Sequence, residues 1–134
     1  MKKNTGLWID HKEAILVSVE GDQTFVQRIE SAAESHLKPS GGWKSGGTVV
    51  AQSVSNEHVA DERRKHQYHA FYQKVIGLLG DSASIALLGP GEAKIELAKE
   101  IERVSLLRNK VAVVEICDRL TEKQLIAKVK AFFL

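Results

Sequence analysis

Residues 88–94, with the sequence LGPGEAK, have the composition of a phosphate-binding turn. They follow a short apolar run and open a helical pattern, so they would join a strand to a helix N-terminus. Free backbone N–H groups and the helix dipole favour an anion at such a place. Gly89 and Gly91 permit a tight turn, and Lys94 adds a positive charge. We predict that these three residues bind a phosphate; the alternative is a turn that only begins a helix, since the spacing is not that of a P-loop.

Two carboxylates, Asp10 and Asp118, are the candidates for metal-assisted catalysis. Each directly follows or closely follows an apolar run that has the character of a strand. Phosphodiester hydrolysis by two metal ions needs carboxylates that hold the ions about 4 Å apart. If the chain is an enzyme, these two residues would serve a small hydrolase or nuclease acting on a nucleotide or RNA. The alternative for Asp10 is a side chain that hydrogen-bonds the backbone of its own turn.

Basic and aromatic residues in two segments indicate RNA binding. Arg63, Arg64 and Lys65 are consecutive in a polar helical pattern, and Trp43 and Lys44 lie in a glycine-rich stretch before it. Basic side chains contact phosphates, and an exposed tryptophan stacks on a base. We predict that these five residues contact RNA; the alternative is a solvated helix face, because acidic residues adjoin the basic run.

The five histidines invite a comparison with zinc sites. His66 and His69 have i, i+3 spacing, and His58 lies two turns before His66. With one cysteine in the chain, a zinc site would need a further histidine from elsewhere. We therefore expect a solvated helix face, with no metal site and no cofactor.

The composition is that of one soluble domain. The chain has 134 residues, of which 43% are hydrophobic and 27% charged, and its formal net charge is +2. No apolar run approaches the roughly 20 residues of a membrane span, and the N-terminus lacks a signal-like apolar segment. The lone Cys117 fits a reducing compartment. We expect a cytoplasmic protein without membrane contact, whose partners are decided by local patches because its overall charge is small.

Hydrophobic periodicity and turn residues predict five strands and three helices. The expected strands are 7–10, 14–19, 24–29, 84–88 and 111–116, and the expected helices run from 55 or 56 to 79, from 92 to about 107, and from 122 onward. Thr121 and Gln124 have the spacing of a capping box before the last helix. Gly80 is expected to end the first helix, whose buried stripe would be Tyr68, Phe71, Tyr72, Val75, Ile76 and Leu79. The core is also expected to contain Trp8 and, from the second helix, Ile95, Ala98 and Ile101 with Leu97 and Val104 alongside. Residues 32–54 lack periodicity and are expected to form a flexible loop.

This order, βββαβαβα, is similar to the ribonuclease H-like plan, an α/β three-layer fold with a five-stranded mixed sheet. In that plan the strands lie in the order 3-2-1-4-5, and the second is antiparallel. Ligands bind open α/β sheets beyond the strand ends at the switch point, here between the first and fourth strands. Asp10, the Gly89–Gly91 turn and Asp118 would converge there, within a single domain that spans residues 1–134.

Three motifs carry a resemblance to a known family. They are WIDHKEA at residues 8–14, GPGEAK with EL at 89–97, and DRLTEKQL at 118–125. Together they resemble small bacterial proteins of the translational-machinery-component type, a family similar to the middle domain of archaeal and eukaryotic peptide-release factors and Pelota. The resemblance implies a ribonuclease H-like fold and a link to ribosomes or structured RNA.

One departure from the release factors bears on activity. Those proteins place a Gly-Gly-Gln tripeptide on a loop before the long helix, whereas residues 45–48 here read SGGT. Thr48 lacks the glutamine amide, so no release activity is expected. The sequence thus predicts a non-catalytic RNA- or ribosome-associated domain of the translation machinery. The alternatives are the metal-dependent hydrolase described above and a protein-interaction module.

Overall fold

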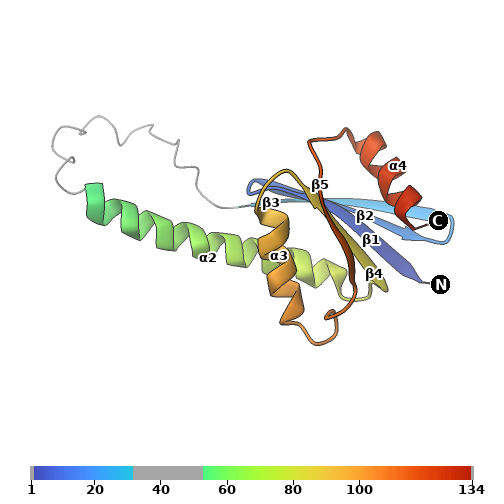
Figure 1. The fold of residues 1–134 in the computed structure, drawn as a ribbon, viewed down its shortest axis with the longest axis horizontal. Coiled ribbons are helices and arrows are strands. Elements are labelled where there is room, and N and C mark those ends of the chain that lie inside the picture. The colour runs from blue at the N-terminus through green and yellow to red at the C-terminus, as the bar shows by residue number, and fades with distance from the viewer. Residues whose placement is uncertain (1, 32–52, 134) are drawn as a thin grey trace.

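The computed structural model describes the backbone of residues 2–31 and 53–133, and the side chains of the second range from residue 62 onward. The expected loop at 32–54 therefore lies almost wholly outside the described residues, as do Trp43 and Lys44. The described elements follow the predicted order (Figure 1). They are β1 (Lys3–Ile9), β2 (Glu13–Glu20), β3 (Gln23–Glu30), α2 (Ser53–Leu79), β4 (Ser84–Gly89), α3 (Ala93–Glu102), β5 (Val111–Ile116) and α4 (Glu122–Phe132).

The five strands form one mixed, open sheet in the order β3-β2-β1-β4-β5. β2 runs antiparallel to both of its neighbours, whereas β1, β4 and β5 are parallel. This confirms the predicted fold class and strand order. The sheet changes winding direction between β1 and β4, so the carboxyl ends of these two strands flank the switch point.

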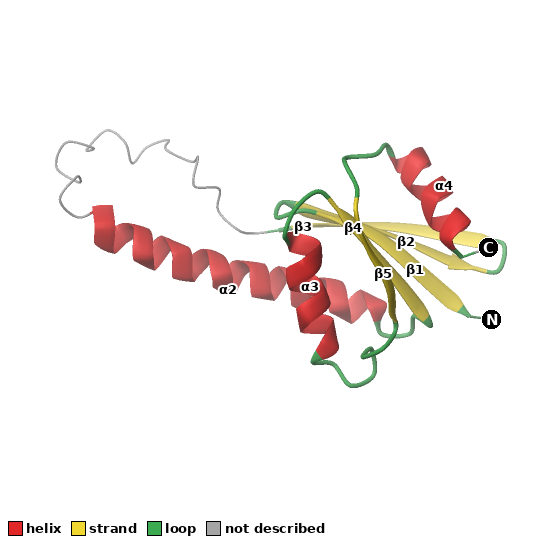
Figure 2. Cartoon of the chain, viewed as in Figure 1, coloured by secondary structure: helices red, strands yellow, loops and turns green. Residues whose placement is uncertain are grey.

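Helices cover both faces of the sheet (Figure 2). Side chains of β1 alternate between the faces, because successive residues of a strand point to opposite sides. Leu7 and Ile9 pack with Leu97 of α3 and the apolar side of α2. Trp8 packs instead with Leu125 and Val129 of α4. The result is the predicted three-layer arrangement, with a core on each side of the sheet.

The strands extend further than hydrophobicity alone indicates. β1 begins at Lys3, because Lys3 through Gly6 pair with the far half of β2. The Thr5 hydroxyl hydrogen-bonds that of Ser82 at 2.7 Å and lies 3.4 Å from the Ser18 hydroxyl, all three residues being buried. These polar side chains satisfy one another, so a polar sequence continues the strand into the interior.

Helix α3 differs from its predicted length and its predicted buried face. It ends at Glu102 rather than near residue 107, and the chain then turns so that Leu107 enters the core at 1% exposure. Asn109 follows with a positive φ of 76°. Leu97 and Ile101 are fully buried as expected, but Ile95, also expected inside, is 38% exposed. This prediction was wrong because α3 turns Leu97 and Ile101 to the core, and Ile95, two residues before Leu97, lies on the opposite side of the helix.

The long helix α2 consists of two unlike halves. Its C-terminal half packs on the sheet through the predicted stripe, and it ends before Gly80 as predicted. The buried members of that stripe are Phe71, Tyr72, Val75, Ile76 and Leu79. The N-terminal half extends past the edge of the sheet (Figure 1). In the parts of the chain that the structure describes, no helix has the length and apolarity needed to cross a membrane.

Candidate functional site

Asp10 lies at the carboxyl end of β1, where its carboxylate closes the β1–β2 turn. One oxygen, Oδ1, accepts hydrogen bonds from the backbone N–H groups of Lys12 and Glu13, both at 2.8 Å. The Asp10 N–H in turn donates to the Glu13 carbonyl at 3.0 Å. These bonds confirm the structural alternative for Asp10, an aspartate that orders its own turn.

Asp118 follows β5 with an exposed side chain, and its backbone is tied to β1. The Trp8 indole N–H is within hydrogen-bond distance of the carbonyl oxygens of Cys117 (3.0 Å) and Asp118 (3.2 Å). Trp8 itself is 3% exposed, in agreement with its predicted place in the core. Arg119 holds its guanidinium 4.8 Å from the Trp8 ring centroid and pairs with Glu13 at 2.5 Å. Trp8 thus fixes the segment that carries Asp118.

Residues 89–94 form the predicted strand-to-helix turn, but two of the candidate phosphate ligands have structural contacts. A Cβ built on Gly89 would lie 2.3 Å from the Ile9 carbonyl oxygen, so strand packing requires a glycine here. Lys94 is 4% exposed, and its amine donates to the Gly91 carbonyl at 2.6 Å. Gly91 is open, with nothing within 4 Å of a built Cβ. Phosphate binding by these residues stays a prediction, and Lys94 would have to leave Gly91 to take part.

A cluster that sequence analysis did not assemble lies beside the switch point: His11, Tyr68, Tyr72 and Glu96, called here the His11–Glu96 cluster. One oxygen of Glu96 accepts from the Tyr72 hydroxyl at 2.5 Å and lies 3.0 Å from His11 Nε2. The His11 ring stacks on Tyr68 with 4.5 Å between centroids. The cluster joins the β1–β2 turn, α2 and α3 at the point where α2 leaves the sheet.

Tyr72 holds its proton tightly in this cluster. Burial of the ring and the hydrogen bond to Glu96 raise the pKa of Tyr72 above its usual value. The hydroxyl therefore stays a donor to the Glu96 carboxylate throughout the physiological pH range. Because the contact joins α2 to α3, it helps to fix the direction in which α2 projects.

We expect Tyr72→Phe to lower the free energy of unfolding by about 1–2 kcal/mol at neutral pH, since it removes a hydrogen bond to a carboxylate that is partly exposed. The wild-type protein should also lose stability as the pH rises above about 10, where an unfolded tyrosine releases its proton and the folded Tyr72 does not. Urea unfolding at neutral and alkaline pH measures both effects.

The matched control is Tyr68→Phe, which keeps the ring that stacks on His11. It should cost less than Tyr72→Phe at neutral pH and retain the wild-type decline at alkaline pH. Equal stability of Tyr72→Phe and wild type at both pH values would contradict a structural role for the cluster.

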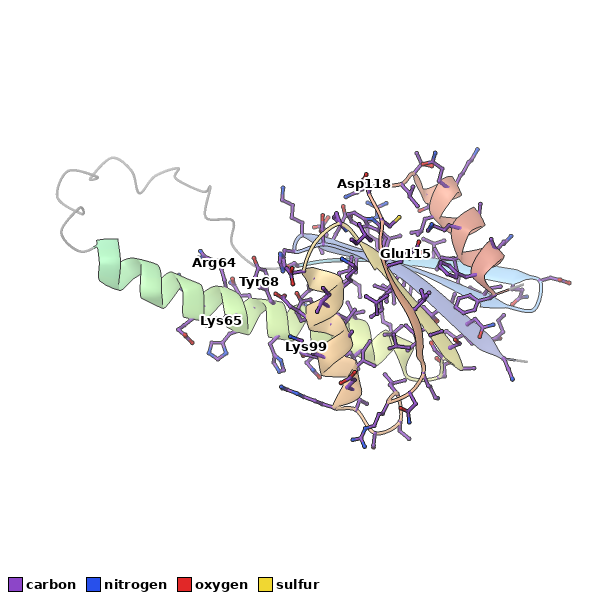
Figure 3. The ribbon with its side chains drawn as sticks, in the orientation of Figure 1. Arg64, Lys65, Tyr68, Lys99, Glu115 and Asp118 are labelled. Atoms are coloured by element: carbon purple, nitrogen blue, oxygen red, sulfur yellow. The ribbon has the colours of Figure 1, made fainter. Side chains whose placement is uncertain are left out.

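The basic segment lies on the projecting part of α2. Figure 3 places Arg64 and Lys65 beyond Tyr68, on the side away from the sheet. Arg63 is exposed, Arg64 is partly exposed, and the Lys65 side chain is 75% exposed with its amine 3.7 Å from Glu62. The three consecutive cations therefore lie on the projecting part of α2, within about a turn and a half of Tyr68.

The missed residues carried only weak sequence signals. Tyr68 and Tyr72 have the i, i+4 spacing of the buried stripe, which predicts packing and says nothing of hydroxyl partners. His11 and Glu96 are 85 positions apart in the sequence, and only the parallel pairing of β1 with β4 brings α3 beside the β1–β2 turn. Within the described part of the chain, no group of three or more His, Cys, Asp or Glu side chains is placed to hold a metal ion.

Comparison with known proteins identifies the fold. No protein-family model matches the sequence, and no protein with a curated description matches it. Among solved structures, the archaeal translation termination factor aRF1 aligns over 96% of this chain with a TM-score of 0.60 and 12% sequence identity. The Thermoplasma acidophilum Pelota protein aligns over 97% with a TM-score of 0.57 and 15% identity.

The chain has the fold of one segment of these two proteins. It spans about a third of each, 34% of aRF1 and 32% of Pelota. The predicted resemblance to release factors and Pelota is thereby confirmed as a likeness of fold, which runs through nearly the whole chain. At such low identity the likeness does not carry over the activity of either protein.

Proposed function

We propose that the chain is an RNA- or ribosome-binding domain of the translation machinery that acts without catalysing a reaction. The observation that carries this proposal is the basic segment of α2, which lies beyond the sheet on a helix whose other half is anchored in the core (Figure 3). The likeness to a termination factor and to Pelota supports a translation context.

The physical basis is electrostatic. Arg63, Arg64 and Lys65 are three consecutive positive charges that follow two carboxylates, Asp61 and Glu62, in the sequence, and the Lys65 amine lies 3.7 Å from Glu62. Lysine and arginine side chains bind nucleic acids mainly by displacing counterions from phosphates. A helix anchored at one end can bring these groups to RNA at a distance from the sheet. Trp43 and Lys44 precede the helix in sequence and are included in the proposed contact.

The turn at residues 89–94 has a secondary place in this proposal. A phosphate of the bound RNA would face the open Gly91 and the N-terminus of α3, the arrangement that favours anions.

The competing hydrolase would need Asp10, whose observed bonds are those of a turn-forming residue. For this reason we propose no catalysed reaction for the chain.

Charge reversal of the basic segment tests the proposal. The triple variant Arg63→Glu, Arg64→Glu, Lys65→Glu should lower the affinity for ribosomes or structured RNA at least about tenfold, since three phosphate contacts are replaced by repulsion. With three contacts, wild-type binding should weaken roughly 20-fold for single-stranded and roughly 40-fold for duplex RNA when the salt concentration rises fourfold. Ribosome co-sedimentation on sucrose gradients at two salt concentrations measures both effects.

A control variant separates a local contact from a change in overall charge. Lys2, Lys123 and Lys130 are exposed and lie away from the basic segment. Reversing these three lysines changes the net charge by the same amount and should leave most of the affinity intact. The proposal is wrong if both triple variants bind equally well, or if the wild-type protein remains unbound at both salt concentrations.

A further inference from the structure

The outer side of β5 exposes an apolar strip beside α3. Val114 and Ile116 of β5 are 43% and 75% exposed, and Ile95 of α3 and Leu106 of the following turn are 38% and 75% exposed. These are four of the six exposed large hydrophobic side chains of the described residues, and two of them belong to β5 itself. Exposed apolar patches, unlike single scattered hydrophobic residues, mark interaction sites.

The strip exists because no described helix covers it. Val114 and Ile116 pair in register with Leu87 and Gly89, on the face that α2 and α3 cover over the inner strands. After β5 the chain crosses to the other face, where α4 packs against Trp8. A groove of about 560 Å³ remains between α3 and β5, lined by Ala98, Leu107, Val111 and Val114 among others.

β5 is also an edge strand that lacks the usual protection. Among the described strands it has one hydrogen-bonded neighbour, β4, and none of them pairs with its other edge. Edges are commonly protected by lysine, proline or unpaired charges. β5 reads VAVVEI, and its single charge, Glu115, is paired with Lys128 at 3.0 Å. The pairing of β5 with β4 has one register shift, at the start of the strand opposite Ile85 and Ala86. From Val113 onward the pairing is regular.

The charges at the two ends of β5 are opposite. Arg108 and Lys110 precede the strand, and the exposed Asp118 follows its carboxyl end (Figure 3). Two copies related by a two-fold axis would place their β5 strands antiparallel, so that each cationic end meets the other copy's anionic end. A parallel arrangement would bring like charges together. This pattern makes the edge complementary to itself.

We propose that the chain forms a two-fold dimer through antiparallel pairing of β5 with β5 of a second copy. The two β4 strands would then be about 14 Å apart, three strand spacings. This spacing exceeds the 8–10 Å between the axes of helices in direct contact, so a narrow gap would remain between the two α3 helices. Ile95, Val114 and Ile116 of both copies would fill this gap. The contact is isologous, as in most homodimers, and it is independent of the RNA contact proposed above.

Sedimentation analysis across the micromolar range tests the dimer. The wild-type chain should sediment at twice its mass of 14.8 kDa. Ile116→Lys should raise the dissociation constant at least tenfold, because it puts a charge into the centre of the apolar strip. The matched control is Phe25→Lys on β3, the opposite edge, where Phe25 is 51% exposed. A wild-type monomer at all concentrations, or dissociation by Phe25→Lys with Ile116→Lys still dimeric, would overturn the proposal.

A charge exchange tests the antiparallel orientation. Arg108→Glu alone and Asp118→Arg alone should each weaken the dimer, since each sets like charges against one another at both ends. A mixture of the two variants should form heterodimers, because both end contacts become attractive again. If both Ile116→Lys and Phe25→Lys dissociate the dimer, hydrogen exchange decides. Protection of the β5 amides that increases with concentration supports the proposal, and protection at β3 instead contradicts it.

Discussion

Gly89→Ala is expected to be the most disruptive glycine-to-alanine change among the described residues. The added Cβ would lie 2.3 Å from the Ile9 carbonyl oxygen, and this oxygen belongs to a backbone fixed by pairing of β1 with both β2 and β4. Neither partner is a flexible side chain, so relief requires the strands to separate. We expect the free energy of unfolding to fall by about 3 kcal/mol or more, a large part of the stability of a domain.

Gly91→Ala is the matched control two residues later. Nothing lies within 4 Å of its built Cβ, so the change in the free energy of unfolding should stay within about 0.5 kcal/mol. Urea unfolding of both variants, monitored by circular dichroism, measures the difference. Equal stability of the two variants would show that the β1–β4 contact can adjust, contrary to the packing argument.

The pair of variants also separates two roles that the sequence motif combines. Gly89 is required by strand packing whether or not a ligand binds. Gly91 is the position at which a methyl group would obstruct a phosphate without disturbing the fold. A stable Gly91→Ala variant with weakened RNA binding would support the phosphate prediction, whereas unchanged binding would leave the turn with a purely structural role.

The fold was predictable from the sequence because its signals are local. Strand patterns, the buried stripe of α2, Gly80 and the Thr121–Gln124 capping box each act within a few residues, and the structure contains all of them. The strand order followed from the succession of elements and the short hairpins between the first three strands. Errors arose where a residue's fate depends on distant neighbours. Ile95 has the spacing of a core residue with Ala98 and Ile101, but the packed structure buries the face of α3 that carries Leu97 instead.

The site was less predictable for the same reason. From the predicted strand order, the sequence placed Asp10, Gly89, Gly91 and Asp118 at one edge of the sheet. The structure has that strand order. The sequence offered turn formation by the Asp10 carboxylate only as one of two alternatives, and it did not indicate that the Lys94 amine would point to the Gly91 carbonyl. The direction of a polar side chain depends on which of several nearby hydrogen-bond partners it binds. Residue type and spacing do not show which partner that is.

Trp8→Ala is expected to have the second large effect. The ring is 3% exposed in the core beneath α4, so truncation should lower the free energy of unfolding by about 3–5 kcal/mol. Trp8→Phe keeps much of the ring volume but removes the indole N–H that serves the carbonyls of Cys117 and Asp118. It should cost about 1–3 kcal/mol. Denaturant unfolding followed by circular dichroism measures both, and equal loss in the two variants would contradict a role for the indole hydrogen bonds.

The Trp8→Phe variant also isolates the other half of the proposed RNA contact. The chain has two tryptophans, so this variant retains only Trp43 as an indole fluorophore. If Trp43 stacks on a base, structured RNA should quench its emission, and the quenching should weaken with salt as binding does. Adding the Arg63, Arg64 and Lys65 reversals to this variant should abolish the quenching. Emission that stays constant while the RNA binds would remove Trp43 from the interface and leave the contact to the projecting basic segment of α2.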